Sequence, residues 1–153
     1  MKKKCATLCI VDMQPRDFPA ADARTRKAVV KLVKEAKRNG AGIVVLEYSN
    51  SSPTSATILK VLKDYKRKVI CKKNHNDGSK EFIKACERHR FNKSHIRVCG
   101  VYTEYCVQET TEGLHERLPG STIEVVVRAC NGDEQHEQWA FEEMKQLEGV
   151  KIV

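Results

Sequence analysis

Apolar residues gather along the chain in short runs that are separated by longer, periodic segments. The run Cys-Ala-Thr-Leu-Cys-Ile-Val at residues 5–11 is nearly continuous, as expected for a strand of a parallel sheet that is covered on both faces. Similar runs predict further strands at residues 43–46, 69–71, 96–101, 123–127 and 150–153.

Between these runs, apolar residues recur every three or four positions, which places them on one face of a helix. Val29, Leu32, Val33 and Ala36 form such a stripe before the Asn-Gly pair at residues 39–40. Strands that alternate with helices form βαβ units with right-handed crossovers, so the sequence predicts one α/β domain over residues 1–153. Further helices are predicted at residues 54–65, 79–88, 107–118 and 133–147, where Ser79 opens the second of these and Thr103 caps the third.

The composition is that of a globular protein, with 41% apolar and 31% charged residues among 153. No run approaches the ~20 apolar residues of a membrane span, and Asp12 interrupts the first apolar run too early for a signal peptide. Seven cysteines cannot all pair within one chain. We therefore expect a cytoplasmic protein with free thiols.

The net charge of +8 is unevenly distributed. Residues 1–100 carry 24 Lys and Arg against 9 Asp and Glu, a net charge of +15, whereas residues 101–153 carry 4 against 11, a net charge of −7. The basic part lacks interleaved aromatic residues and any nucleic-acid-binding motif, so a basic binding module is the less favoured interpretation. The pattern favours a dipolar molecule whose opposite faces meet in a homo-oligomer.

Three reactive side chains follow predicted strands at their carboxyl ends, where open α/β sheets bind ligands. Asp12 follows the first strand, Lys73 follows the third, and Cys106 lies in the first turn of the helix after the fourth. A helix N-terminus and a nearby lysine would both favour the thiolate of Cys106. Taken singly, Asp12 also fits a turn cap and Lys73 a solvated surface residue. Five other cysteines lie in strands or on an inward helical stripe and are interpreted as packing residues, namely Cys5, Cys9, Cys71, Cys86 and Cys99.

These residues lie in segments that resemble the isochorismatase-like cysteine hydrolases, the superfamily that includes the nicotinamidases. The segments are Val11-Asp-Met-Gln14, Lys73, and Val98-Cys-Gly-Val-Tyr-Thr-Glu-Tyr-Cys-Val107, of which the last is the most specific. The resemblance extends over nearly the whole chain. It implies a three-layer, Rossmann-like α/β fold with a six-stranded parallel sheet in the order 3-2-1-4-5-6 and helices on both faces.

The resemblance also implies a catalytic triad. Cys106 would be the nucleophile, Asp12 would accept and return its proton, and Lys73 would orient Asp12 and support the thiolate, with the adjacent Lys72 as the competing choice. The implied reaction attacks the carbonyl carbon of a small amide, breaks its C–N bond and forms a thioester on Cys106. A vinyl-ether hydrolase, another non-amide member and a non-catalytic member are the alternatives.

In this family a non-proline cis peptide bond precedes the oxyanion hole. By position it falls at Val101–Tyr102, and the implied donors are the backbone N–H groups of Tyr102 and Cys106. Side chains near strand ends that are candidates for the substrate pocket, although each also fits plain packing, are Phe18, Tyr48, His75, Tyr102 and Tyr105.

The sequence departs from the family pattern in three places. Nicotinamidases bind a metal through histidines after the second strand, but residues 47–54 contain no histidine, so we expect no metal and no other cofactor. The spacing from Asp12 to Phe18 is one residue longer than usual, which displaces Phe18, and Arg128 stands where relatives commonly carry aspartate. A zinc site could be formed by four candidate ligands, Cys71, His75, Cys86 and His89. It is disfavoured because the sequence spacing between these residues does not match a common zinc finger.

Overall fold

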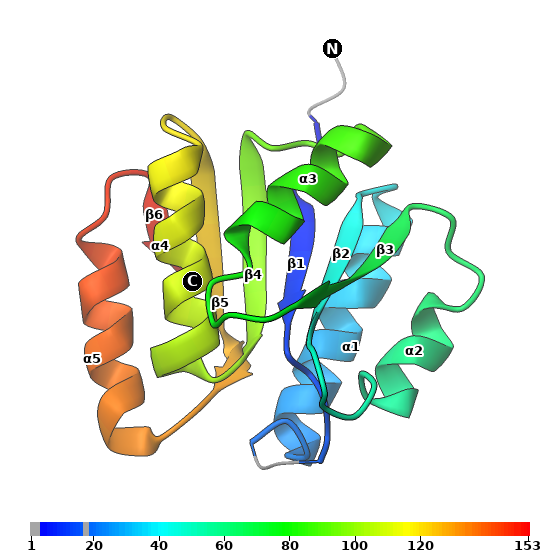
Figure 1. The fold of residues 1–153 in the computed structure, drawn as a ribbon, viewed down its shortest axis with the longest axis horizontal. Coiled ribbons are helices and arrows are strands. Elements are labelled where there is room, and N and C mark those ends of the chain that lie inside the picture. Colours follow the sequence, from blue (N-terminus) through cyan, green and yellow to red (C-terminus); the bar gives the residue numbers. More distant parts are fainter. Residues whose placement is uncertain (1–3, 17–18) are drawn as a thin grey trace.

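The computed structural model describes residues 4–16 and 19–153, and over these residues the strands form one parallel six-stranded sheet. The strand order is β3-β2-β1-β4-β5-β6, which confirms the predicted topology (Figure 1). The strands are β1 (Thr7–Val11), β2 (Ile43–Tyr48), β3 (Lys68–Lys73), β4 (His95–Val101), β5 (Thr122–Asn131) and β6 (Val150–Ile152).

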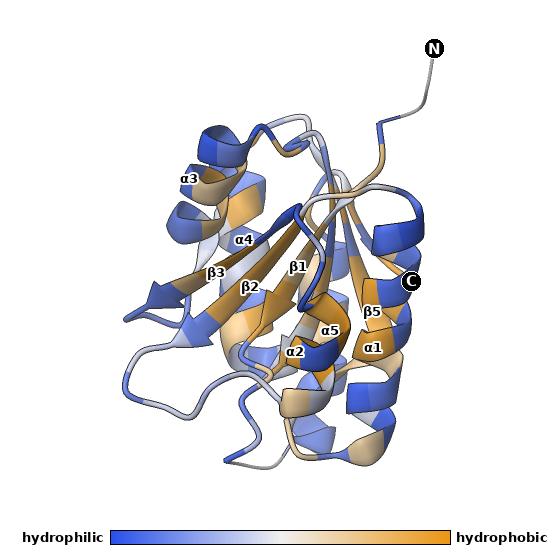
Figure 2. Cartoon of the chain, turned by 90° about the vertical axis from the view of Figure 1, so that its right-hand side faces the viewer, coloured by the Kyte–Doolittle hydropathy of each residue, from blue (hydrophilic) through white to orange (hydrophobic). Residues whose placement is uncertain are grey.

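Helices cover both faces of the sheet and make a three-layer fold. On β1, Leu8 and Ile10 pack with the residues of the α1 and α2 side, whereas Cys9 and Val11 pack with those of the opposite side, because successive strand residues point to opposite faces. Figure 2 shows the apolar strands between helices whose outer surfaces are hydrophilic. One layer holds α1 (Ala23–Arg38) and α2 (Ala56–Leu62), and the other holds α3 (Ser79–His89), α4 (Gln108–Arg117) and α5 (Glu134–Lys145).

Carboxylate caps fix the starts of the two longest helices. The Asp22 side chain accepts a hydrogen bond of 2.9 Å from the backbone N–H of Thr25 at the start of α1, and Asp133 caps α5 in the same way. Within the described residues, no helix is both long enough and apolar enough to cross a membrane.

The structure confirms that α3 starts at Ser79, whereas the predicted hydroxyl cap by Thr103 is wrong. Ser79 is the first residue inside α3, and its buried hydroxyl accepts a hydrogen bond of 3.1 Å from Arg117 Nε on α4. The Thr103 hydroxyl donates to Glu137 on α5 at 2.9 Å. Both hydroxyls therefore join neighbouring helices instead of satisfying the N–H groups of their own helix.

Thr103 also begins a segment that the periodicity did not reveal. A five-residue π-helix, η1 (Thr103–Val107), precedes α4, so Cys106 lies in a widened helical turn directly after β4. The fifth strand runs to Asn131 instead of ending at Val127, with a register shift against β4 between Val98 and Gly100. The extension brings β5 up to the carboxyl edge of the sheet, beside η1.

Candidate active site

The carboxyl edge of the sheet brings together the three side chains that the sequence singled out. Asp12 directly follows β1, Lys73 ends β3, and Cys106 lies in η1 after β4. The Nζ of Lys73 lies 3.0 Å from Oδ2 of Asp12, and the negative charge of Asp12 acts on the nearby thiol of Cys106, which itself donates to Oδ1 of Asn76 at 3.6 Å. A largely buried carboxylate is therefore paired with a cation and lies close to a thiol.

Lys73 is buried in a site that compensates its charge. Its residue is 1% exposed, and its Nζ donates to the backbone carbonyl of His75 at 2.9 Å and to that of Asn76 at 3.3 Å, in addition to Asp12. The same Nζ lies 4.5 Å from the centre of the Tyr48 ring. A buried ammonium group is costly unless it is paired and hydrogen-bonded, and these partners meet that condition.

Lys72 points to the opposite side of the strand. Its Nζ forms an ion pair of 3.1 Å with Oε1 of Glu47, and its side chain is 61% exposed. Adjacent strand residues face opposite sides of a sheet, so one of the two lysines alone can reach Asp12. The geometry assigns that position to Lys73.

Burial is the largest influence on the pKa values of Asp12 and Cys106. Burial raises the pKa of Asp12, although the Lys73 charge and the hydrogen bond from Cys106 act against it. The pKa of the Cys106 thiol is raised to about 12, first by burial and then by the negative charge of Asp12 and the hydrogen bond to it, and Lys73 offsets only part of this. The expectation of a stabilised thiolate is therefore wrong for the resting protein, which holds a neutral thiol beside its proton acceptor.

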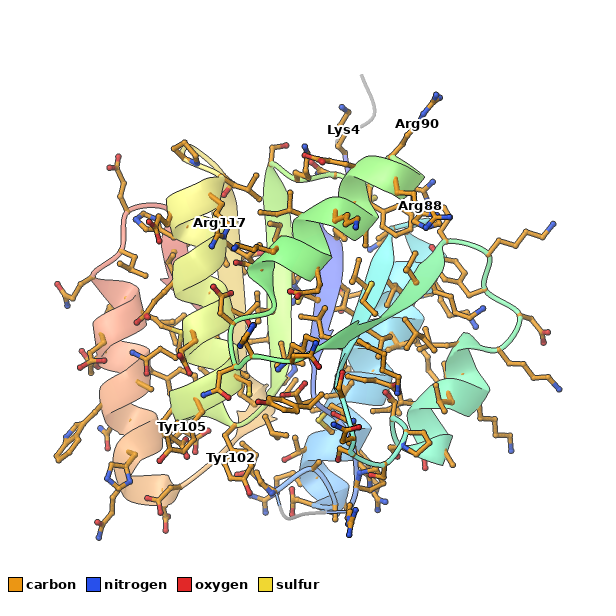
Figure 3. All side chains as sticks on the ribbon, in the orientation of Figure 1. Lys4, Arg88, Arg90, Tyr102, Tyr105 and Arg117 are labelled. Atoms are coloured by element: carbon orange, nitrogen blue, oxygen red, sulfur yellow. The ribbon has the colours of Figure 1, made fainter. Side chains whose placement is uncertain are left out.

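A cavity of about 600 Å³ opens onto these groups. Tyr48, Tyr102 and Tyr105 all line it, and the rings of the last two meet edge to face at 6.1 Å near the carboxyl edge of the sheet (Figure 3). The remaining lining residues are Asp12, Gln14, Arg16, Ala20, Ser49, Asn50, Ser51, Asn76, Val101 and Cys106.

Two of the sequence candidates do not contribute a side chain to this cavity. The side chain of His75 is exposed and is not part of the lining; the residue serves the site through its carbonyl group on Lys73. Arg128 is exposed on β5 and lines a separate cavity between α1 and α5. Phe18 lies outside the described residues.

Two polar residues of the site were given no role by sequence reasoning. Gln14 clamps the loop after β2, since its Nε2 donates to the carbonyls of Tyr48 (3.0 Å) and Ser52 (2.7 Å) and its Oε1 accepts from the Tyr48 N–H (2.8 Å). Asn76 accepts from the Cys106 thiol through Oδ1 at 3.6 Å, and its Nδ2 donates to Glu109 at 2.7 Å. The position of Gln14 two residues after Asp12 was a usable signal, whereas nothing in the sequence marked Asn76.

The backbone beside Cys106 has the feature that the family resemblance implied. The peptide bond between Val101 and Tyr102 is cis, and both residues line the cavity with Cys106. Tyr102 is also the residue from which η1 starts, since its carbonyl accepts hydrogen bonds from the N–H groups of Tyr105 and Val107.

The side chains of the cavity do not suit a metal ion. Asp12 is its one lining carboxylate among the described residues, and Lys73 already pairs with it. Ser49, Asn50 and Ser51 supply hydroxyl and amide groups where a nicotinamidase-type metal site needs histidine. Elsewhere in the described part of the chain, no three His, Cys, Asp or Glu side chains are placed to hold an ion, the four residues of the disfavoured zinc site included.

Comparisons with known proteins point to one family. A family model described as the isochorismatase domain matches residues 6–152. A sequence search of curated proteins finds no match. The nicotinamidase of Staphylococcus aureus is 16% identical at a TM-score of 0.83, over 99% of this chain and 100% of that one.

Two other solved structures share the fold. A ribonuclease from Caenorhabditis elegans is 19% identical at a TM-score of 0.80, over 100% of this chain and 79% of that one. An octameric hydrolase of unknown specificity from Escherichia coli is 21% identical at a TM-score of 0.75, over 97% of this chain and 74% of that one. At these identities the likeness concerns the fold, and proteins with different activities share it.

Proposed function

The chain belongs to the isochorismatase family of hydrolases, and from this premise we propose that it cleaves the C–N bond of a small amide with Cys106 as the nucleophile. One observation carries the proposal: a largely buried carboxylate, Asp12, is held by Lys73 at 3.0 Å and lines the same cavity as the Cys106 thiol, whose pKa it raises. A thiol, a base within reach and a group that orients the base form the arrangement of nucleophilic catalysis. The nicotinamidase among the structural neighbours supports the choice of an amide bond.

The proposed reaction begins with transfer of the thiol proton to Asp12. The sulfur of Cys106 attacks the carbonyl carbon, and the negative oxygen that forms is held by the backbone N–H groups of Tyr102 and Cys106. Asp12 then returns the proton to the amide nitrogen, the C–N bond breaks, and ammonia or an amine leaves a thioester on Cys106. A water molecule gives a proton to Asp12 and attacks the thioester, which releases the carboxylic acid and restores the thiol.

The pKa values of the pair suit this sequence of steps. Because the pKa of Cys106 is raised, the thiol keeps its proton until a substrate is in place. Because burial raises the pKa of Asp12, its carboxylate is a stronger base than an exposed one. No step needs a metal ion or an organic cofactor.

The experiment that tests the proposal is a measurement of ammonia release from a panel of small primary amides, nicotinamide included. Active amides should lose at least about 10³-fold in rate with Cys106→Ala. The matched control is Cys5→Ala, because Cys5 is an exposed thiol at the opposite edge of the sheet. Acid quenching during turnover should trap an acyl group on Cys106 that mass spectrometry detects.

Failure of the whole panel to release ammonia, with no acyl group on Cys106, would contradict the amidase proposal. Hydrolysis of a vinyl ether under those conditions would instead identify a non-amide member of the family. Retention of full activity by Cys106→Ala would contradict the nucleophile assignment alone.

We further propose that residues 1–153 act as a single hydrolase domain in a reducing compartment, the cytoplasm, and that the protein forms homo-oligomers. All seven cysteines are unpaired, and a thiol nucleophile needs reducing conditions to remain active. The octameric structural neighbour and the uneven charge of the chain support assembly of several copies.

A further inference from the structure

The outer surface of the α1–α2 layer carries a positively charged groove. This groove, which we call the basic groove, has a volume of about 400 Å³. It is lined by Ala23, Arg26, Lys27, Val30, Lys31, Lys34 and Thr57. Four of these residues are cations, and no carboxylate of the described chain is among them. The side chain of Val30 and the aliphatic stems of the lysines offer apolar surface beneath the charges.

The helical periodicity of α1 explains this surface. Its buried residues, such as Val29, Leu32 and Val33, face the sheet, so the residues between them face outward. Glu35 is the single acidic residue of α1, and it pairs with Arg97 at 3.3 Å, away from the groove. Among the described residues, no carboxylate lines the basic groove to balance its positive charge.

Helix α5 presents the opposite chemistry. Ala140 and Met144 face the core, whereas Trp139 is 68% exposed, the most exposed of the large hydrophobic residues. Glu142 and Glu143 follow Trp139 by one helical turn and are exposed on the same side. The Trp139 ring thus stands on the surface, edge to face with His136 at 5.9 Å, and Glu143 accepts a hydrogen bond from Gln108 of α4 at 2.6 Å. We call Trp139, Glu142 and Glu143 the acidic knob.

We propose that the acidic knob of one copy binds in the basic groove of a second copy. Trp139 would pack on Val30 and the lysine stems, with cations near its ring face, and Glu142 and Glu143 would pair with the lysines at the groove rim. Trp is enriched among residues that dominate interface energies, and attraction between an aromatic ring and cations adds to the contact. Opposite charges on the two surfaces also speed encounter and exclude contact between like surfaces.

The positions of the two surfaces determine the kind of assembly. The basic groove lies on the α1–α2 face, and α5 lies on the other face, beyond the β5 side of the sheet (Figure 1). A pair of copies cannot form both contacts across one two-fold axis, since the surfaces of a copy face away from each other. The contact is therefore head-to-tail, and it builds a closed ring or a chain. It involves no residue of the catalytic cavity and does not rest on the amidase activity.

Sedimentation velocity over a range of protein concentrations tests this contact. The wild-type protein should associate at about 0.01 M salt and dissociate at about 1 M salt, where the Debye length falls from about 30 Å to about 3 Å. Trp139→Ser should weaken the association by about 30-fold. The control for charge reversal is Lys80→Glu/Lys84→Glu, which replaces two exposed lysines of α3 and should assemble like the wild type.

Charge reversal on each surface gives the decisive comparison. Lys27→Glu/Lys31→Glu should be monomeric alone, because the groove of one copy then repels the acidic knob of the next copy. Glu142→Lys/Glu143→Lys should be monomeric for the corresponding reason. A one-to-one mixture of these two variants should assemble again, since each reversed surface then meets its complement. Circular dichroism checks that both variants are folded.

Two kinds of result would overturn the proposal. One is a wild-type protein that stays monomeric at every concentration and salt tested, or a mixture of folded variants that does not assemble. The other is a monomer whose groove binds single-stranded polyuridylate and loses that binding with Lys27→Glu/Lys31→Glu, which would assign the groove to a nucleic acid instead.

Discussion

Asp12 is the residue on which the site depends, because it is shared between a cation and a thiol. Its backbone has φ of 48°, in the left-handed region that aspartate tolerates better than most residues, and this conformation lies directly after β1. Burial raises its pKa, while Lys73 is the strongest influence in the opposite direction. The charge of Lys73 therefore helps to set the pH below which the Asp12 carboxylate becomes protonated and can no longer act as a base.

Removal of the Lys73 charge should move the acid limb of the pH–rate profile. The reaction needs the Asp12 carboxylate, so activity falls as the pH drops through the pKa of Asp12, which is already above its ordinary value. In Lys73→Gln that pKa rises further, and we expect the acid limb of kcat/KM to shift to higher pH together with a loss of rate. The measurement is kcat/KM against pH on the best amide.

Lys72→Gln is the matched control, since Lys72 pairs with Glu47 and not with Asp12. Its acid limb should coincide with that of the wild type. If the rate of Lys73→Gln is too low to follow, the pH dependence of Cys106 alkylation provides the same comparison. An acid limb that stays in place or moves to lower pH in Lys73→Gln would contradict the role given to the ion pair.

The residues of this site were easier to predict from the sequence than their pKa values. Asp12, Lys73 and Cys106 were all recognisable because each lies shortly after a predicted strand in a family-like segment. The direction of the Cys106 pKa was not, because a helix N-terminus and a lysine are visible in a sequence, whereas the extent of burial and the approach of Asp12 are not. Asn76 was missed for the same reason, as it meets Cys106 only through the fold.

At the scale of elements, the junction of β1 with β4 fixes the geometry of the site. Val11 pairs with Gly100 across the two strands, and Gly100 has φ of 120°. A Cβ atom on Gly100 would collide with the backbone of Val11. The glycine therefore allows the close approach of the two strands whose next residues, on each side, are Asp12 and Val101.

Gly100→Ala should be strongly destabilising. Two costs add, the unfavourable φ of a residue with a side chain and the collision with the Val11 backbone, and we expect a loss of about 3 kcal/mol or more in the free energy of unfolding. Gly120→Ala is the control, since Gly120 has φ of 84° but nothing within 4 Å of its Cβ position, and should lose only about 1 kcal/mol. Urea unfolding of the three proteins measures both, and equal losses would show that crowding at Val11 is unimportant.

The element pattern shows which parts of the fold a sequence determines locally. Every strand and α-helix was predicted, because apolar runs and helical stripes are local features, whereas the strand order came from the family resemblance and the π-helix η1 was not predicted. The extension of β5 to Asn131 was not predicted, since Arg128 interrupts the apolar run and the pairing with β4 alone continues the strand. The predicted Thr103 cap was wrong because the Thr103 hydroxyl has a partner on another helix.

At the scale of the whole molecule, the cysteines act as a set. Buried thiols occur in both core layers, and burial raises the pKa values of all five of them: Cys9, Cys86, Cys99, Cys106 and Cys130. A thiol released by unfolding ionises near its ordinary pKa of 9.0, whereas Cys86 and Cys99 hold their protons up to about 12 in the folded protein. The folded state therefore binds more protons than the unfolded state across this range.

This difference makes the fold sensitive to alkaline pH. A group whose pKa is raised by folding contributes stability that is complete below the pKa of the unfolded state and is lost as the pH rises toward the folded pKa, here between pH 9.0 and about 12 for Cys99. We expect the free energy of unfolding, measured with urea under a reducing agent, to fall from pH 8 to pH 10 by on the order of 1 kcal/mol per buried thiol.

Cys99→Ala should be less stable than the wild type at pH 8 because it loses packing, yet its stability should fall less steeply with pH because it has one thiol fewer to ionise. Cys5→Ala removes an exposed thiol and should keep the wild-type slope. Identical slopes in all three proteins would mean that the buried thiols do not govern the alkaline limit, since a loss of packing alone shifts the curve without changing its slope.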